Sequence, residues 1–169
     1  IGGLIASENL LKINIASDVL NKAIISSSFV DVEVESLNNN SAGIIIAHNL
    51  TISARQNIDN SGQVYGQNGL KIVAKNLINI GEDSLISGLN NNELNITLAL
   101  ENEGEISSSK KVLIKAGSLN NKKDAAIISL DNLEVLTAGN LTNNGNIFAH
   151  NNANINAENA VNAEFGMIN

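Results

Sequence analysis

The sequence predicts an all-β protein, a parallel β-helix of about eight coils with roughly 20 residues in each coil. Three observations predict this fold. An asparagine recurs at a nearly constant interval, an alternating apolar segment precedes it, and a glycine turn with a second short apolar segment follows it. A constant period of this length is typical of proteins in which short units stack along one axis.

The recurring asparagine lies two positions after an apolar residue. Successive members are separated by 18, 21, 19, 23, 19, 22 and 19 residues. The eight members are Asn21, Asn39, Asn60, Asn79, Asn102, Asn121, Asn143 and Asn162. Stacked asparagine side chains can each donate to one neighbour and accept from the other, which satisfies their polar groups inside a core. We therefore expect an internal asparagine ladder, and the alternative is a series of solvated turns.

The segments before the asparagines alternate apolar and polar residues, as in residues 50–54, 70–74, 94–98 and 153–157. Alternation with a period of two indicates a strand with one buried and one solvated side. The apolar residues of these segments, Leu98 among them, are expected to point into the core.

A turn follows the asparagine and usually contains a glycine, at Gly43, Gly62, Gly81, Gly104 and Gly145. We attribute these glycines to the positive φ that sharp turns often require. One coil is therefore predicted to consist of a strand, an asparagine turn, a glycine, a short strand and a loop.

The short strand places an aliphatic residue inward and a small residue inward two positions later. The residues between them, which should point outward, are Ile46, Tyr65, Ser87, Ser107 and Phe148. Core packing does not explain apolar residues at these places. We expect Ile46, Tyr65 and Phe148 to form a lateral contact face, while the alternative is that they are ordinary, singly exposed apolar residues.

Composition narrows the functional class. Hydrophobic residues make up 43% of the chain but aromatic residues only 2%, so the core must be aliphatic. Proline, which interrupts backbone ladders, and cysteine are both absent. The net charge of −7 argues against nucleic acid as a partner, because phosphate binding depends on clustered lysine and arginine.

Candidate catalytic or metal-binding residues are few. Glu101, Glu103 and Glu105 could supply oxygen ligands to Ca²⁺, but their sequence context favours a solvated turn. His48 and His150 occupy matching points of coils that are far apart, so they cannot share a metal. We expect no catalytic residue, no metal site, no cofactor and no enzymatic activity.

The pattern from Leu50 to Val64, repeated from Leu133 to Ile147, resembles the haemagglutinin repeats of filamentous haemagglutinin-like exoproteins. These proteins are adhesins and contact-dependent growth inhibition proteins of two-partner secretion in Gram-negative bacteria. The resemblance implies a right-handed β-helix, secretion through an outer-membrane transporter and a place on the bacterial cell surface. The family's secretion domain typically carries an Asn-Pro-Asn motif, which a chain without proline cannot contain.

We therefore expect residues 1–169 to be a single β-helix segment from the shaft of a longer exoprotein, in contact with a host or neighbouring-cell receptor. Uncapped ends should expose Ile13, Ile15 and Val161 and favour self-association. The alternative function is that of a polysaccharide-active β-helix enzyme or a tailspike-like protein, which needs paired acids and clustered aromatic residues. The sequence leaves open whether the parent protein is an adhesin or a growth inhibition protein.

Overall fold

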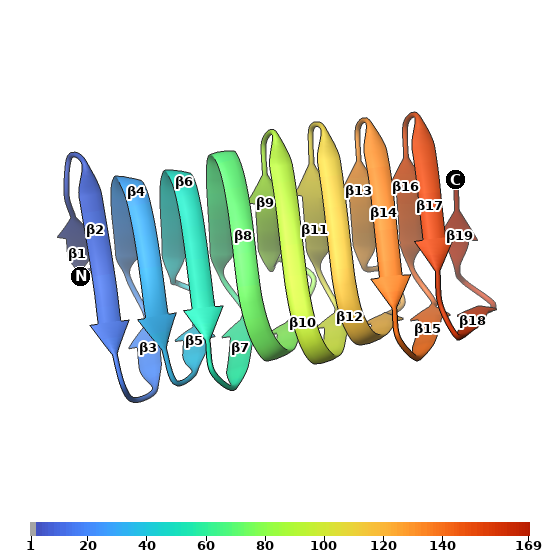
Figure 1. Ribbon diagram of the computed structural model, residues 1–169, viewed down its shortest axis with the longest axis horizontal. Helices are drawn as coiled ribbons and strands as arrows, with labels where there is room; N and C mark the ends of the chain where they lie inside the picture. Colours follow the sequence, from blue (N-terminus) through green and yellow to red (C-terminus); the bar gives the residue numbers. More distant parts are fainter. Residues whose placement is uncertain (1–2) are drawn as a thin grey trace.

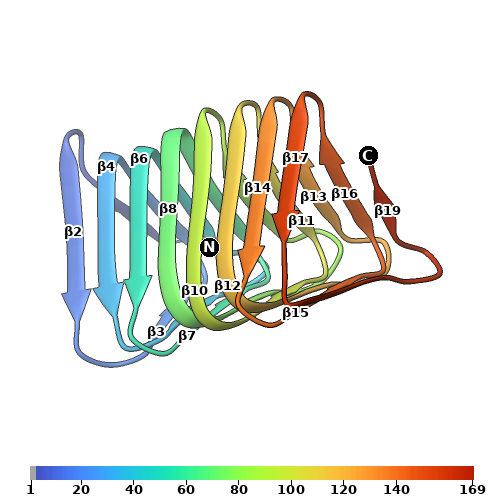
Figure 2. The same cartoon turned by 45° about the vertical axis from the view of Figure 1, so that its right-hand side comes forward.

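The computed structural model describes residues 3–169, which form a β-solenoid of about eight turns built only from parallel strands. In Figure 1 the nearer strands run downward and the farther strands run upward while the chain advances from left to right, so the β-helix is right-handed. The two ends of the chain lie at opposite ends of the rod. Figure 2 shows that each coil turns three corners and so gives the rod three faces.

The first face, which we call the short-strand face, begins each coil. It contains β1 (Leu4–Ala6), residues 24–27 of β4 (Ile24–Val34), residues 44–47 of β6 (Ile44–Ala54), residues 63–66 of β8 (Gln63–Asn79), β9 (Leu85–Gly88), β11 (Glu105–Ser108), β13 (Ala126–Ser129), β16 (Asn146–Ala149) and β19 (Met167–Ile168). The strand β19 opens a ninth coil.

The second face, the long-strand face, contains the alternating segments. It consists of β2 (Leu10–Ile15), the second halves of β4 and β6, the middle of β8, the first halves of β10 (Asn91–Asn102) and β12 (Lys111–Asn121), β14 (Asn132–Thr137) and β17 (Asn152–Asn156). The third face, the asparagine face, consists of β3 (Val19–Asn21), β5 (Leu37–Asn39), β7 (Asn57–Asn60), the ends of β8, β10 and β12, β15 (Asn140–Asn143) and β18 (Asn159–Asn162).

The core is a set of aliphatic columns, because residues at equivalent places of successive coils lie in register. Ile25, Ile45, Val64 and Ile86 form one column on the short-strand face, and none of them is more than 3% exposed. Strand alternation places every second side chain inside, so each coil contributes several aliphatic groups to a single hydrophobic cluster. The predicted fold class is confirmed.

One predicted strand pattern is wrong by two residues. The alternation places Leu98 inside, but it is 55% exposed at the corner between the long-strand face and the asparagine face. The register instead pairs Asn92 with Leu70 and Leu94 with Ile72, so Asn92 occupies the first inward position. The chain has an irregularity of register between Ile96 and the asparagine face, and this irregularity brings Leu98 to the outside.

The conformational reason given for the turn glycines holds only for Gly81, which has a φ of 83°. At Gly43, Gly62, Gly104 and Gly145 the reason is steric. A Cβ at Gly62 would lie 2.2 Å from the carbonyl oxygen of Gly43, and one at Gly145 would lie 2.2 Å from a backbone oxygen of the previous coil. Glycine is required there because successive turns stack too closely for any side chain.

The turns between the asparagine face and the short-strand face alternate in length. Longer turns occur in every second coil, and each is closed by a backbone hydrogen bond between residues three apart. These bonds are Gly43 N to Asn40 O, Ser84 N to Gly81 O, Ala125 N to Lys122 O and Gly166 N to Ala163 O. The alternation explains why the spacings of the asparagines alternate between 18–19 and 21–23 residues.

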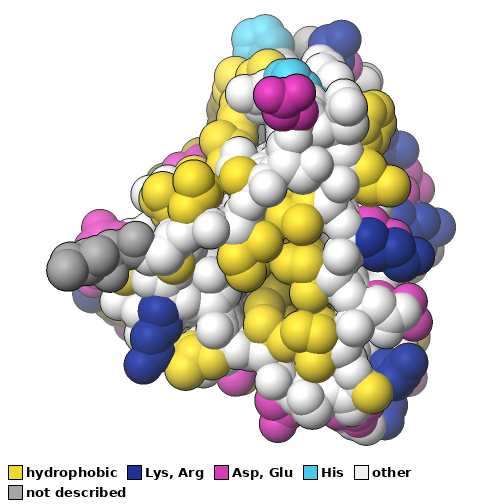
Figure 3. All heavy atoms as spheres, turned by 90° about the vertical axis from the view of Figure 1, so that its left-hand side faces the viewer, with side chains coloured by type: hydrophobic (Ala, Val, Ile, Leu, Met, Phe, Trp, Pro, Cys, Tyr) yellow, Lys and Arg dark blue, Asp and Glu magenta, His cyan; other side chains and the backbone are white. Residues whose placement is uncertain are grey.

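The amino-terminal end of the rod exposes the apolar interior (Figure 3). Ile5 and Ile15 point along core columns and are 53% and 40% exposed, and Ile13 is partly buried. At the other end Val161 is exposed as predicted, but it does not belong to the apolar interior of the rod. Val161 is exposed because it pairs with the outward Thr142, whereas Ala160 takes the inward place under Leu141.

Candidate interaction surface

The eight asparagines selected from the sequence form one continuous ladder inside the rod. Each side-chain amide nitrogen donates to the side-chain oxygen of the next asparagine, with seven hydrogen bonds of 2.8–2.9 Å running from Asn21 to Asn162. Asn39, Asn60 and Asn102 are fully buried, whereas Asn162 at the carboxy-terminal end is exposed.

The ladder also holds the turns that follow it. The Asn102 amide lies 3.0 Å from the carbonyl oxygen of Gly104 and 3.0 Å from that of Ala126, the first residue of β13 two coils further on. Asn60 makes the equivalent contacts with Gly62 and Leu85, at 3.1 and 3.2 Å. Asn60 and Asn102 thus each hold the turn that follows them and the first residue of the short strand two coils further on, which is a structural role.

The predicted lateral contact face corresponds to one outward row on the short-strand face. Ile46 pairs with Tyr65 in the next coil, and Tyr65 pairs with Ser87. The row continues through Ser107 and then Ile128, which the sequence pattern missed, to Phe148. Ile46, Tyr65 and Phe148 are partly exposed.

A second outward row runs beside the first and was not recognised from the sequence. It comprises Leu4, Ile24, Ile44, Gln63, Leu85, Glu105, Ala126, Asn146 and Met167. These residues immediately precede the inward aliphatic residue of each short strand, and this position was the signal that could have revealed them. Together the two rows form an apolar, almost uncharged surface along one side of the rod.

The long-strand face is charged, in contrast. Its outward residues form ion pairs between successive coils, including Lys12 with Asp31 at 3.4 Å and Lys111 with Glu134 at 2.9 Å. A hydrogen bond of 2.7 Å from Asn95 lowers the pKa of the Glu93 carboxyl, and the nearby Lys71 lowers it further. These exposed pairs join neighbouring coils, but each pair contributes little to the free energy of unfolding.

The three glutamates near residue 103 do not share one strand face. Glu101 lies on β10 and forms an ion pair of 2.8 Å with Lys122, an interaction that raises the pKa of that lysine. Glu103 accepts a hydrogen bond of 3.0 Å from the backbone nitrogen of Gly81, and Glu105 begins β11 on another face. Within residues 3–169 no group of three or more acidic, histidine or cysteine side chains is arranged to hold a metal ion.

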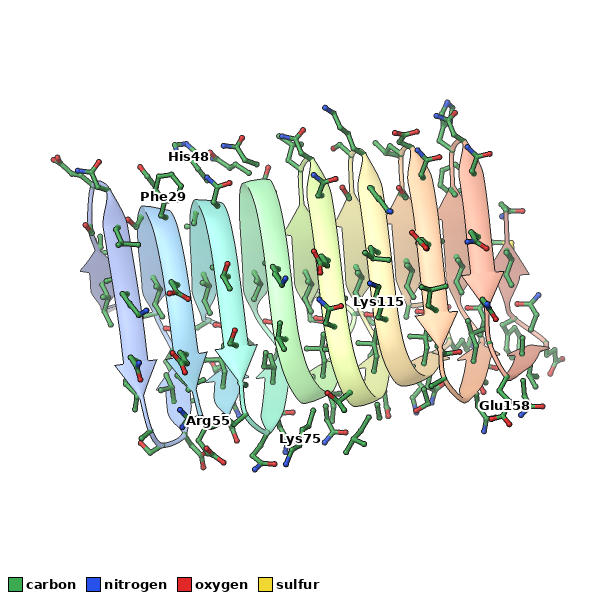
Figure 4. The ribbon with its side chains drawn as sticks, in the orientation of Figure 1. Phe29, His48, Arg55, Lys75, Lys115 and Glu158 are labelled. Atoms are coloured by element: carbon green, nitrogen blue, oxygen red, sulfur yellow. The ribbon has the colours of Figure 1, made fainter. Side chains whose placement is uncertain are left out.

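The two histidines lie at the corner between the short-strand and long-strand faces, and both are exposed. His48 stands at this corner beside Phe29, whereas Arg55 and Lys75 lie at the opposite corner (Figure 4). His150 is located five coils further along. The structure thus separates the two histidines, as the sequence indicated.

Open depressions of the described residues span several successive coils. A hollow of about 480 Å³ at one corner is lined by Thr97, Lys115, Gly117, Thr137 and Asn156 among others. Its lining contains no carboxylate. A glycosidase requires two carboxyl groups on either side of the bond that it cleaves, so this hollow does not have the residues of such a site.

Comparisons of the chain with known protein families, with curated proteins and with solved structures found no match. None of the described residues belongs to a helix that is long and apolar enough to cross a membrane.

Proposed function

We propose that this chain is a structural and interaction segment in the shaft of a large secreted exoprotein on the bacterial surface. The parent protein is an adhesin or a contact-dependent growth inhibition protein that is exported by an outer-membrane transporter. The shaft separates a terminal domain from the cell, and its short-strand face contacts a receptor on a host or neighbouring cell.

The observation that carries the proposal is the uninterrupted stack of coils joined by the asparagine ladder. Eight coils at about 4.8 Å each form a rod on the order of 40 Å long. Every coil bonds to its neighbours through backbone, amide and core contacts, which suits a stiff spacer. The resemblance of residues 50–64 and 133–147 to haemagglutinin repeats supports the same function.

The alternative is a polysaccharide-active enzyme or tailspike-like protein. Such proteins bind sugars through carboxylates and stacked aromatic rings on one face. Tyr65 and Phe148 share a row here, but three coils lie between them, and Phe29 and Phe165 lie elsewhere. The arrangement favours the interaction segment over the enzyme.

Binding to target cells by the segment displayed on beads tests the receptor contact. Replacing Ile46, Tyr65 and Phe148 together by serine should reduce binding about tenfold or more, because buried apolar and aromatic contacts dominate interface energies. The matched control replaces three partly exposed apolar residues on the long-strand face, Val73, Leu113 and Leu136, by serine. This control should bind as the wild type does.

Equal binding by both triple variants and the wild type would contradict the receptor contact. The export route is tested separately, by placing residues 1–169 behind the secretion domain of a two-partner system. The segment should appear outside the cell only when the transporter is present. Retention inside cells that export the same secretion domain alone would contradict the shaft assignment.

A further inference from the structure

Two asparagines of the chain, Asn68 and Asn144, are followed directly by glycine. An asparagine in this position can lose its side-chain amide spontaneously, because the backbone nitrogen of the next residue can attack the side-chain carbonyl carbon. Glycine favours the attack, since its backbone rotates most easily and carries no Cβ near the reacting atoms. Both pairs offer the same reacting groups, so their surroundings decide where the reaction proceeds.

The pair at Asn144 is held by the coils on both sides. The Asn144 backbone nitrogen donates a hydrogen bond of 2.8 Å to Asn121, and the Gly145 carbonyl oxygen accepts one of 2.8 Å from Met167. The position of a Cβ on Gly145 is 2.2 Å from the carbonyl oxygen of Ala125. This backbone cannot rotate toward the Asn144 side chain without breaking contacts with its neighbours.

The pair at Asn68 lies at the corner between the short-strand and long-strand faces. At this corner β8 contains Gln67 and Asn68, where β6 of the preceding coil contains only His48. Pairing with the following coil ends at Gly66 and resumes at Leu70. Asn68 therefore lies outside the register that joins the described strands.

The reacting groups of this second pair have solvent and space around them. The Asn68 side chain is exposed. No described atom lies within 4 Å of the position that a Cβ on Gly69 would occupy. A ring that joins Asn68 to Gly69 displaces no neighbour, whereas carbonyl oxygens fill the corresponding space at Gly145.

We propose that Asn68 is a site of spontaneous deamidation in the folded protein. The Gly69 amide gives its proton to hydroxide, and its nitrogen forms a bond to Cγ of Asn68. The bond from Cγ to the side-chain nitrogen breaks, and that nitrogen takes a proton from water and leaves as ammonia. Water then adds to either carbonyl carbon of the resulting succinimide and opens the ring to aspartate or isoaspartate.

Either product adds a negative charge at this corner. The corner borders the almost uncharged short-strand face and is also the place of His48, one coil earlier (Figure 4). Each molecule thus acquires a carboxylate beside this face as it ages, without the action of an enzyme. The inference does not depend on the function proposed above.

The test follows both asparagines in the purified protein during incubation at mildly alkaline pH. Digestion with pepsin at acidic pH and tandem mass spectrometry then measure the converted fraction at each position. We expect conversion at Asn68 to be at least about tenfold faster than at Asn144. In urea, where the fold no longer protects either pair, the two rates should be similar. Methyl transfer by an isoaspartyl methyltransferase should label position 68 of the aged folded protein.

Two variants assign the reaction to the named atoms. Gly69→Ala should fold, because the space beside Gly69 is open, and should slow the conversion of Asn68 by about tenfold or more. Asn144→Gln is the matched control and should leave the rate at Asn68 unchanged.

Equal rates at Asn68 and Asn144 in the folded protein would overturn the inference. It would also be overturned by conversion of Asn68 that is more than about a hundredfold slower in the folded chain than in urea, since the corner would then be protected. An unchanged rate at Asn68 in a folded Gly69→Ala variant would contradict the attack by the Gly69 nitrogen.

Discussion

The asparagine ladder allows one substitution to be predicted in detail, Asn102→Ala. Asn102 is fully buried, accepts a hydrogen bond of 2.9 Å from Asn79 and donates one of 2.9 Å to Asn121. Truncation leaves the Asn121 side-chain oxygen without its donor inside the core, at about 1–3 kcal/mol. The Asn79 amide keeps contacts of 3.2 and 3.4 Å with backbone carbonyls, so the loss on that side is smaller.

Losing the contacts between the Asn102 amide and backbone carbonyls adds about 1 kcal/mol. The Gly104 carbonyl keeps a backbone hydrogen bond of 2.9 Å from Ala126, which limits this contribution. The expected total is a decrease of about 2–4 kcal/mol in the free energy of unfolding. A chain of this size should then melt about 5–15 °C lower. Urea unfolding followed by circular dichroism measures the change.

Two control substitutions make the prediction specific. Asn144→Ala, one position beyond the ladder member Asn143, should change stability by less than about 0.5 kcal/mol. Asn162→Ala, at the exposed end of the ladder, should cost less than Asn102→Ala because water can replace the lost partner. Equal decreases for Asn102→Ala and Asn144→Ala would refute the reasoning that the ladder stabilises the core.

Three further predictions concern a turn glycine, the buried Asn92 and the Glu93 carboxylate. Gly104→Ala should destabilise the protein by more than about 2 kcal/mol, because its Cβ would lie 2.4 Å from the backbone carbonyl oxygen of Ser84, whereas Gly69→Ala has open space and should be nearly neutral by the same urea assay. Asn92→Leu should raise the melting temperature, since the buried Asn92 oxygen has no hydrogen-bond partner and leucine has a similar shape; a lower melting temperature would show that its amide contacts outweigh this. The lowered pKa of Glu93 means that the stabilisation from its carboxylate is present above the ordinary pKa of 4.5 and is lost as the pH falls through the lowered value. Asn95→Ala should raise the pKa of Glu93 in an NMR titration and shrink this loss, and an unchanged pKa would contradict the assigned cause.

The ladder and the outward row were predictable because both depend on short-range sequence periodicity. An asparagine that recurs with an apolar residue two positions before it occupies the same place in every coil, so stacking follows from the period alone. Ile46 and Tyr65 could be placed in one row for the same reason. The second row through Ile44 and Leu85 was missed, although each member immediately precedes the inward aliphatic residue of its short strand; the register shows that these residues belong to the strand and not to the turn before it.

Coil 5, formed by β9 and β10, marks the limit of this reasoning. The alternation of Leu94, Ile96 and Leu98 is as regular as in the other coils, yet the neighbouring strands select Asn92 as the first inward residue. The sheet hydrogen bonds to two adjacent coils fix the register, and their free energy outweighs the gain from burying one leucine.

The sequence by itself determined the fold class, the number of coils and the ladder, because a repeated pattern of apolar and amide side chains has one way to bury its apolar groups and satisfy its amides. Only the tertiary structure decided which turns project and why glycine is needed in them, since the steric limit at Gly62 and Gly104 comes from the carbonyl groups of the coil below. It also decided that uncharged outward side chains gather on the short-strand face of the rod. Which face an outward residue belongs to depends on where each corner falls, and the corners differ by one or two residues from coil to coil.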